Sequence, residues 1–66
     1  MLRSEDVERV RAAMHVLPPE QREVVKLRMY EELKFIEIAA KLNVPLGTVL
    51  TRMQAALKKL RKALDP

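Results

Sequence analysis

The stretch from residue 35 to residue 64 constrains the fold of this chain more than any other, and it reads FIEIAAKLNVPLGTVLTRMQAALKKLRKAL. Its first apolar residues recur at the i, i+3, i+4, i+7 spacing of one helix face, which predicts a short helix over residues 35–42. These residues are Phe35, Ile38, Ala39 and Leu42. Asn43 comes next, and Asn tolerates the left-handed conformation that ends many helices. We therefore expect a positive φ at Asn43, followed by a second helix over residues 46–62.

Three residues around this turn complete a known pattern. Pro45 suits the opening of the second helix, because its fixed φ and missing N–H cost nothing there. Val44 provides an apolar plug in the turn, and Ala39 is small where two steeply crossing helices would meet. A short helix, a tight turn and a second helix of this kind form a helix-turn-helix, whose second helix enters the DNA major groove. The long helix is therefore the candidate reader of DNA.

The net charge of the chain is concentrated on this long helix. The chain has 13 basic and 9 acidic residues, which gives a net charge of +4. Residues 1–45 hold eight basic and eight acidic side chains, whereas residues 46–66 hold five basic side chains against Asp65 alone. The five are Arg52, Lys58, Lys59, Arg61 and Lys62. Such a distribution is expected when one element faces a polyanion, and a solvated basic helix face is the alternative interpretation.

Composition argues against several other classes of protein. The chain has no Cys, which excludes a disulfide framework and a thiolate metal site, and its single His argues against the usual zinc sites. No apolar run approaches the length of a membrane span, and the charged N-terminus lacks the order of a signal peptide. There is no Gly-rich phosphate loop and no nucleophile–base pair at motif spacing. We therefore expect a protein that is not an enzyme and that needs no cofactor or metal.

Two further helices are predicted upstream. Ser4 is a good N-cap for a helix over about residues 5–16, whose apolar stripe is Val7, Val10, Met14 and Leu17. Pro18 and Pro19 stop this helix and open the next one, which ends near residues 30–32. The buried side of that helix is predicted to hold Val24, Val25, Leu27 and Met29, and its wet side Arg22, Lys26 and Arg28. Four helices without a strand signal predict one small all-α domain over residues 1–66, which we expect to be a fragment of a longer chain.

A specific set of residues supports a closer assignment. The set comprises Leu17-Pro18, Gln21-Arg22-Glu23-Val24, Leu27-Arg28, Leu33, Glu37-Ile38-Ala39, Leu42, Gly47-Thr48-Val49, Arg52, Ala56 and Leu60. Over residues 17–64 the chain resembles region four of bacterial sigma factors, and especially the extracytoplasmic-function type. The resemblance implies a four-helix domain that binds the minus-thirty-five promoter element and docks on the β flap of RNA polymerase. It also implies a bacterial cytoplasmic, nucleoid-associated location and a possible anti-sigma partner.

The resemblance also implies which residues face DNA. The family reads DNA with side chains aligned to positions 50, 51, 54 and 55, where basic residues are common at 50 and 55. This chain has Leu50 and Ala55 there, so that Thr51 and Gln54 remain as polar readers. Thr48 and Arg52 are also expected toward the DNA, and Lys34, Lys41 and Lys58 on its phosphates. Pro45 replaces the hydroxyl that usually caps this helix, and Glu32 replaces a Gly that often ends the second helix.

A second apolar stripe on the long helix suggests a protein partner. A core-facing seam is predicted at Leu46, Val49, Met53, Ala56, Leu60 and Ala63. Leu50, Leu57 and Leu64 lie beside this seam at sevenfold spacing. Either the first helix folds back and covers this stripe, or the stripe forms a homodimer or docks a partner helix. The alternative function is therefore a sigma-like module that acts in protein interaction or dimerisation instead of DNA recognition.

Overall fold

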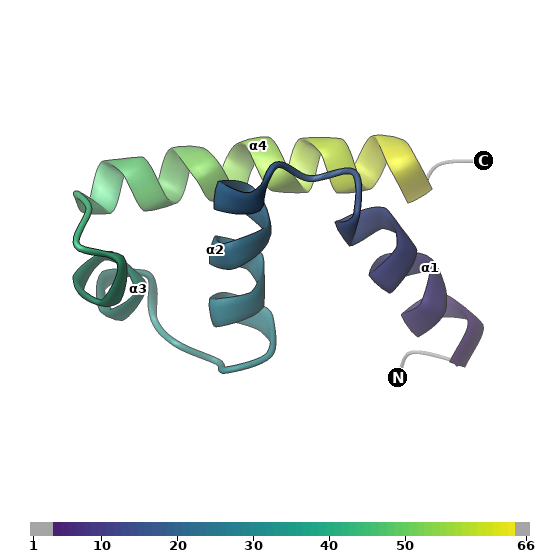
Figure 1. Ribbon diagram of the computed structural model, residues 1–66, viewed down its shortest axis with the longest axis horizontal. Helices are drawn as coiled ribbons and strands as arrows, with labels where there is room; N and C mark the ends of the chain where they lie inside the picture. The colour runs from purple at the N-terminus through teal and green to yellow at the C-terminus, as the bar shows by residue number, and fades with distance from the viewer. Residues whose placement is uncertain (1–3, 65–66) are drawn as a thin grey trace.

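The computed structural model describes the backbone of residues 4–64, and the side chains of residues 8, 9 and 11–64. Four helices follow one another in this range: α1 (Ser4–Met14), α2 (Pro19–Met29), α3 (Phe35–Leu42) and α4 (Leu46–Leu64). No strand occurs between residues 4 and 64. The all-α prediction is confirmed. The long helix α4 lies along one side of the molecule, and α3, α2 and α1 pack against it in turn along its length (Figure 1).

The core lies between α4 and the other three helices. Its largest fully buried side chains are Leu17, Val24, Leu27, Ile38 and Val49. From α4 the buried side chains are Val49, Met53, Ala56 and Leu60, which recur at steps of three and four residues. Burying an aliphatic side chain of this size stabilises a fold by about 1.5–3 kcal/mol. The three shorter helices therefore hold α4 by one face and leave its opposite face open.

The turn between α3 and α4 is held by the backbone itself. Asn43 has φ 56° and ψ 47°, the left-handed conformation that was predicted for it. The N–H of Val44 donates to the carbonyl of Ala39 at 3.0 Å, and the N–H of Asn43 donates to the carbonyl of Ala40 at 3.3 Å. These two bonds are those of a Schellman motif. The carbonyl of Pro45 then accepts the N–H of Thr48 at 3.0 Å and so begins α4.

The junction between α1 and α2 is held by one side chain. The guanidinium of Arg22 donates to three backbone carbonyls at the end of α1, at 3.1 Å to Met14, 3.4 Å to His15 and 2.9 Å to Leu17. Arg22 is half-buried, although the helix pattern predicted it on the wet side. A long side chain at the edge of the buried face can bring its charged end to carbonyls that a helix end leaves without partners.

The connection between α2 and α3 contains a second left-handed residue, Glu32, with φ 56°. Arg28, like Arg22, was predicted on the solvent-exposed side of its helix but contributes to the packing of this connection. Arg28 is half-buried, donates to the carbonyl of Leu33 at 3.2 Å, and lies 5.2 Å from the centroid of the Phe35 ring. The carboxylate of Glu37 accepts the N–H of Lys34 at 2.7 Å and caps the start of α3. The loop is therefore fixed at both ends.

Helix α1 ends at Met14 and not at residue 16 as predicted. The N–H groups of His15, Val16 and Leu17 all donate to carbonyls three residues earlier. These tighter turns lead the chain into Pro18, and a residue that precedes proline avoids the helical conformation. The predicted cap at Ser4 and the stripe residues Val7 and Val10 involve side chains outside the described residues.

Three residues predicted in the core are exposed instead. Met29 is 60% exposed: it follows the buried Val25 by one turn, at the last residue of α2, where it lies at the rim of a pocket instead of inside the core. Leu46 and Ala63 belong to the predicted seam of α4, but both are exposed. They lie in the first and last turns of α4, although Leu64, the residue after Ala63, packs against the core. Helical spacing identifies the face that packs and does not identify where the packing stops.

Candidate nucleic-acid interface

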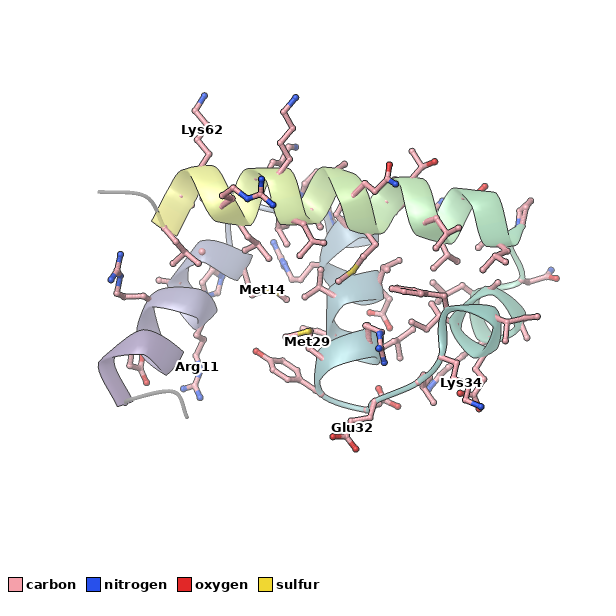
Figure 2. The ribbon with its side chains drawn as sticks, turned by 180° about the vertical axis from the view of Figure 1, so that it is seen from behind. Arg11, Met14, Met29, Glu32, Lys34 and Lys62 are labelled. Carbon is pink, nitrogen blue, oxygen red and sulfur yellow. The ribbon has the colours of Figure 1, made fainter. Side chains whose placement is uncertain are left out.

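The open face of α4 carries a row of exposed polar and basic side chains. They are Thr51, Gln54, Lys58, Arg61 and Lys62, together with Gly47 at the start of the helix. We call these six residues the free face. At 3.6 residues per turn they fall opposite the buried Val49, Met53 and Ala56. Lys62 points away from α1 and α2, as Figure 2 shows. A straight helix thus presents one polar side to solvent while its other side holds the core.

The electrostatics of α4 favour an anion. The helix carries five basic residues and no acidic residue, and its first turn in particular has no acid. The aligned peptide dipoles add partial positive charge at the N-terminal end of α4, directly after Pro45. A shallow depression lies at this end and is lined by Pro45, Gly47, Thr48, Thr51 and Arg52. Positive potential and an accessible surface therefore coincide at the start of α4.

Five of the predicted DNA-facing residues come together on α4. Thr51, Gln54 and Lys58 are exposed on the free face, and Thr48 and Arg52 are half-buried at its edge beside the depression. Gly47 was part of the family motif without a predicted role. Nothing lies within 4 Å of the place where a Cβ would be at this residue. The helix surface at Gly47 is therefore open to close approach.

The two predicted phosphate contacts outside α4 lie on or beside α3. Lys34 immediately precedes α3, and its side chain points away from α4 (Figure 2). Lys41 is in the last turn of α3, and its Nζ lies 3.2 Å from Oε1 of Glu31. This ion pair is half-exposed on both sides, so it partly offsets the charge of Lys41. The structure does not bring these lysines onto the free face.

A second surface lies between α1, α2 and α4. It is a small apolar pocket of about 70 Å³, lined by Met14, Val25, Met29, Tyr30, Met53, Leu57 and Leu60. We call it the apolar groove. Met29, Tyr30 and Leu57 are exposed at its rim, by 60%, 63% and 45%, and the other four residues are buried. Tyr30 was not among the predicted site residues, and Met29 was predicted in the core. The available signal was the position of these two large side chains at the end of α2, directly before Glu31 and Glu32.

The predicted leucine stripe is only partly covered. Leu64 is half-buried and packs against the core, and α1 packs on this end of α4. Leu57 remains exposed in the apolar groove, and Leu50 is 39% exposed outside it, nearer the start of α4. The first helix therefore folds back as one alternative required, but it does not reach the whole stripe.

Residues 13–62 match the family model for sigma-70, region 4. The chain belongs to the sigma-70 region 4 family. This finding confirms the predicted family, and the match begins a few residues before the run on which the resemblance was based. The four helices and the helix-turn-helix are accordingly those of a region 4 domain. None of the helices described for this region 4 domain is both long and apolar enough to span a bilayer.

Individual relatives agree with the family. The domain is 45% identical over 53 residues to the RNA polymerase sigma-E factor of Streptomyces antibioticus, covering 80% of this chain and 29% of that protein. It is 46% identical over 48 residues to the ECF RNA polymerase sigma factor SigW of Bacillus subtilis (strain 168), covering 73% and 26%. It is 35% identical over 57 residues to the ECF RNA polymerase sigma factor SigK of Mycobacterium bovis, covering 86% and 30%. The chain spans less than a third of the length of these relatives.

Proposed function

We propose that this region 4 domain binds double-stranded promoter DNA in transcription initiation and recognises the minus-thirty-five element. The start of α4 enters the major groove, with the helix-turn-helix holding it at the required angle. The observation that carries the proposal is the free face of α4, which is polar, basic and without an acidic residue on a helix whose other face is buried. The proposal assigns no catalytic role to the domain. Membership of the family does not favour the alternative function, in which the domain acts in protein interaction or dimerisation instead of DNA recognition.

The residues of α4 have different roles in this proposal. Gln54 contacts a base edge, since an amide side chain can bond both N6 and N7 of adenine. Thr51, one turn earlier on the same exposed face, contacts a neighbouring base. Thr48 and Arg52, at the edge of the depression, and Lys58, farther along the helix, contact phosphates and set the register of the helix in the groove. Lys34 and Lys41, which lie beside and on α3, remain predicted phosphate contacts at the edge of the DNA interface.

Base recognition is tested with duplexes selected by the domain from a random library. Gln54→Ala should reduce discrimination at one base pair by about 1–3 kcal/mol, because a bidentate contact is lost there. Lys58→Ala should weaken binding to every sequence by a similar factor, because phosphates carry no sequence information. Binding isotherms on the selected duplex and on its single-base variants measure both effects. Equal loss of specificity in the two variants would contradict the assigned roles.

The electrostatic part of the proposal is tested by salt. If five basic side chains neutralise phosphates, the plot of log K against log salt should have a slope of about −4 to −5. Titrations of a promoter-like duplex at several salt concentrations give this slope. Absence of binding at the lowest salt concentration would contradict DNA recognition by this domain.

We also propose that the apolar groove docks the domain on RNA polymerase, at the β flap of the core enzyme. The support is the exposed apolar rim of Met29, Tyr30 and Leu57 over a buried floor, on a different side of α4 from the free face. Large apolar side chains gathered at a surface pocket are typical of protein contacts. DNA and polymerase would then hold opposite flanks of the same helix. An anti-sigma protein or a second copy of the domain are other possible occupants of the groove.

The docking surface is tested with Leu57→Glu, which places a charge at the rim of the groove. Binding to RNA polymerase core should fall strongly, whereas DNA binding should stay within a factor of about two, since Leu57 is not on the free face. Leu50→Glu, on the same stripe but outside the groove, is the matched control and should leave polymerase binding intact. Sedimentation velocity at high concentration tests the homodimer. A wild-type dimer that Leu57→Glu dissociates would assign the groove to self-association instead.

A further inference from the structure

Helix α4 is longer than a single pass through the major groove requires. Its 19 residues correspond to about 28 Å at a rise of 1.5 Å per residue. The major groove of B-DNA is about 12 Å wide. The span from Gly47 to Gln54 corresponds to about 10 Å of helix axis and suffices for contact with bases. Lys62 follows Gln54 by about 12 Å, so the end of the helix extends past the edge of the groove when its start lies on the bases.

The chemistry of the free face changes along this length. Its first half is uncharged, with Gly47, Thr51 and Gln54. Its second half is cationic, with Lys58, Arg61 and Lys62, all exposed. Neutral hydrogen-bonding groups suit base edges, whereas cations suit phosphate oxygens. The change of chemistry occurs between Gln54 and Lys58, which is also where the helix would leave the groove.

The far half of α4 is supported as firmly as its start. Helix α1 packs beneath it, where Leu60 is buried and Leu64 is half-buried against the core. Arg9 Nη2 donates to the carbonyl of Leu64 at 2.8 Å and so caps the last turn. The ribbon of α4 runs on past α2 and over α1 (Figure 1). The cations at this end are therefore carried on a braced helix, and Lys62 points away from α1 (Figure 2).

A simpler reading assigns these cations to the helix itself. Arg61 and Lys62 lie in the last turn, where positive charge offsets the negative end of the helix dipole. In that case their loss lowers thermal stability and leaves the salt dependence of DNA binding unchanged. The two readings thus differ in a measurable quantity.

We infer that Arg61 and Lys62, together with Lys58, form a phosphate-backbone site beside the base-contacting part of α4, an inference that rests on the proposed function. This site binds the DNA strand that flanks the recognised element, without regard to its sequence. Affinity and sequence discrimination are then carried by different halves of one helix. Helix α1 acts as the support that keeps the cationic half in line with the other.

The test is the double variant Arg61→Gln/Lys62→Gln, since Gln keeps helix propensity and removes the charge. Two DNA probes are used: a duplex selected by the wild-type domain and a random-sequence duplex. The magnitude of the log–log salt slope should fall by about 1.8, because each phosphate contact contributes about 0.9. Affinity for both probes should fall by the same factor, so that their ratio is unchanged. The matched control is the pair Arg11→Gln and Lys26→Gln, which removes two exposed cations of α1 and α2 that lie outside the free face.

The outcomes separate the inference from the proposed function. Wild-type domain that binds neither probe at low salt would overturn DNA recognition itself. Wild-type binding with a steep slope that the double variant retains would overturn only the phosphate site. A changed ratio between the two probes would mean that Arg61 or Lys62 contacts bases, which also contradicts the inference. Far-UV circular dichroism confirms that each variant is folded, and a lower melting temperature with an unchanged slope would support the helix-dipole reading instead.

Discussion

The junction between α3 and α4 and the junction between α1 and α2 are stabilised in different ways. Between α3 and α4 the chain reverses at one left-handed residue, Asn43. Two backbone hydrogen bonds, donated by the N–H groups of Asn43 and Val44, hold this turn. Between α1 and α2 the chain instead depends on the guanidinium of Arg22, which serves three carbonyls at once. The first junction needs no side-chain donor. The second depends on a single one.

The difference shows that backbone hydrogen bonds hold the helix-turn-helix, whereas one long side chain, that of Arg22, holds α1 to α2. A turn built from backbone bonds keeps its geometry as long as one residue can adopt a positive φ. The junction between α1 and α2 loses all three of its side-chain bonds when Arg22 is removed, and only the tight backbone turns at residues 15–17 remain. The helix-turn-helix should therefore tolerate most substitutions around it, whereas α1 should be released by one.

The largest effect is expected for Arg22→Met. The variant removes the part-buried donor from the carbonyls of Met14 and Leu17; Met14 keeps the N–H of Leu17, whereas an unsatisfied buried acceptor such as the Leu17 carbonyl costs about 1–3 kcal/mol. We expect the free energy of unfolding to fall by about 2–3 kcal/mol, with faster amide hydrogen exchange in α1 than in α3. Urea denaturation followed by circular dichroism measures the first quantity. Lys26→Met on the exposed side of α2 is the control, and an equal loss there would refute the role of Arg22.

A smaller loss is expected for Asn43→Val. A β-branched residue is disfavoured in the left-handed conformation, which costs most residues about 1–2 kcal/mol. Stability should fall by about that amount in thermal or urea unfolding. Asn43→Gly should be neutral or slightly stabilising, since Gly adopts a positive φ readily. If both variants lose the same stability, the side chain of Asn43 matters more than its backbone conformation.

Glu32→Gly tests the third connection of the domain, between α2 and α3, which contains a left-handed residue as the α3–α4 turn does. Relief of the left-handed strain exceeds the extra entropy of Gly in the unfolded chain, so we expect a gain of about 0.5–1 kcal/mol. Glu32→Ala removes the same charge but keeps the Cβ. It should therefore leave the melting temperature nearly unchanged. A similar gain in the Ala variant would point to charge repulsion with Glu31 and not to backbone strain.

The smallest effect is expected for Lys41→Gln, which breaks the ion pair with Glu31. Pairs this exposed contribute about 0–1 kcal/mol, and salt screens them. Unfolding in low salt should show a loss of a few tenths of a kcal/mol that disappears in high salt. A loss above about 1 kcal/mol, or one that salt does not remove, would show that Lys41 stabilises the domain in some other way.

The helix-turn-helix was predictable from sequence because its signals are local. The bounds of α3, the positive φ of Asn43 and the start of α4 after Pro45 agree with the prediction. Each follows from a single residue type that has few other backbone options. The predicted end of α1 was less accurate. Pro18 disfavours helical conformation in the residues before it, and the tight turns that these residues form have no distinctive residue pattern.

What the sequence could not supply is the extent of contact between helices. Periodicity placed Thr51, Gln54 and Lys58 on one face of α4, but it could not show that Lys41 pairs with a glutamate ten residues earlier. It also could not show that the neighbouring helices leave Met29 exposed, or that Arg28 lies over the ring of Phe35. These outcomes depend on helix lengths and crossing positions, which a helical pattern does not encode.

Gly47 gives the recognition helix room for evolutionary change. It lies in the first turn of α4 without a positive φ, so its backbone does not require glycine, and the space above it is empty. Glycine in a helix lowers stability by about 1 kcal/mol relative to alanine. A larger residue at position 47, proline excepted, would therefore add a side chain to the surface proposed to face DNA without weakening the helix. A new preference for target sequence can arise at this residue in one step, without a second mutation to restore the fold.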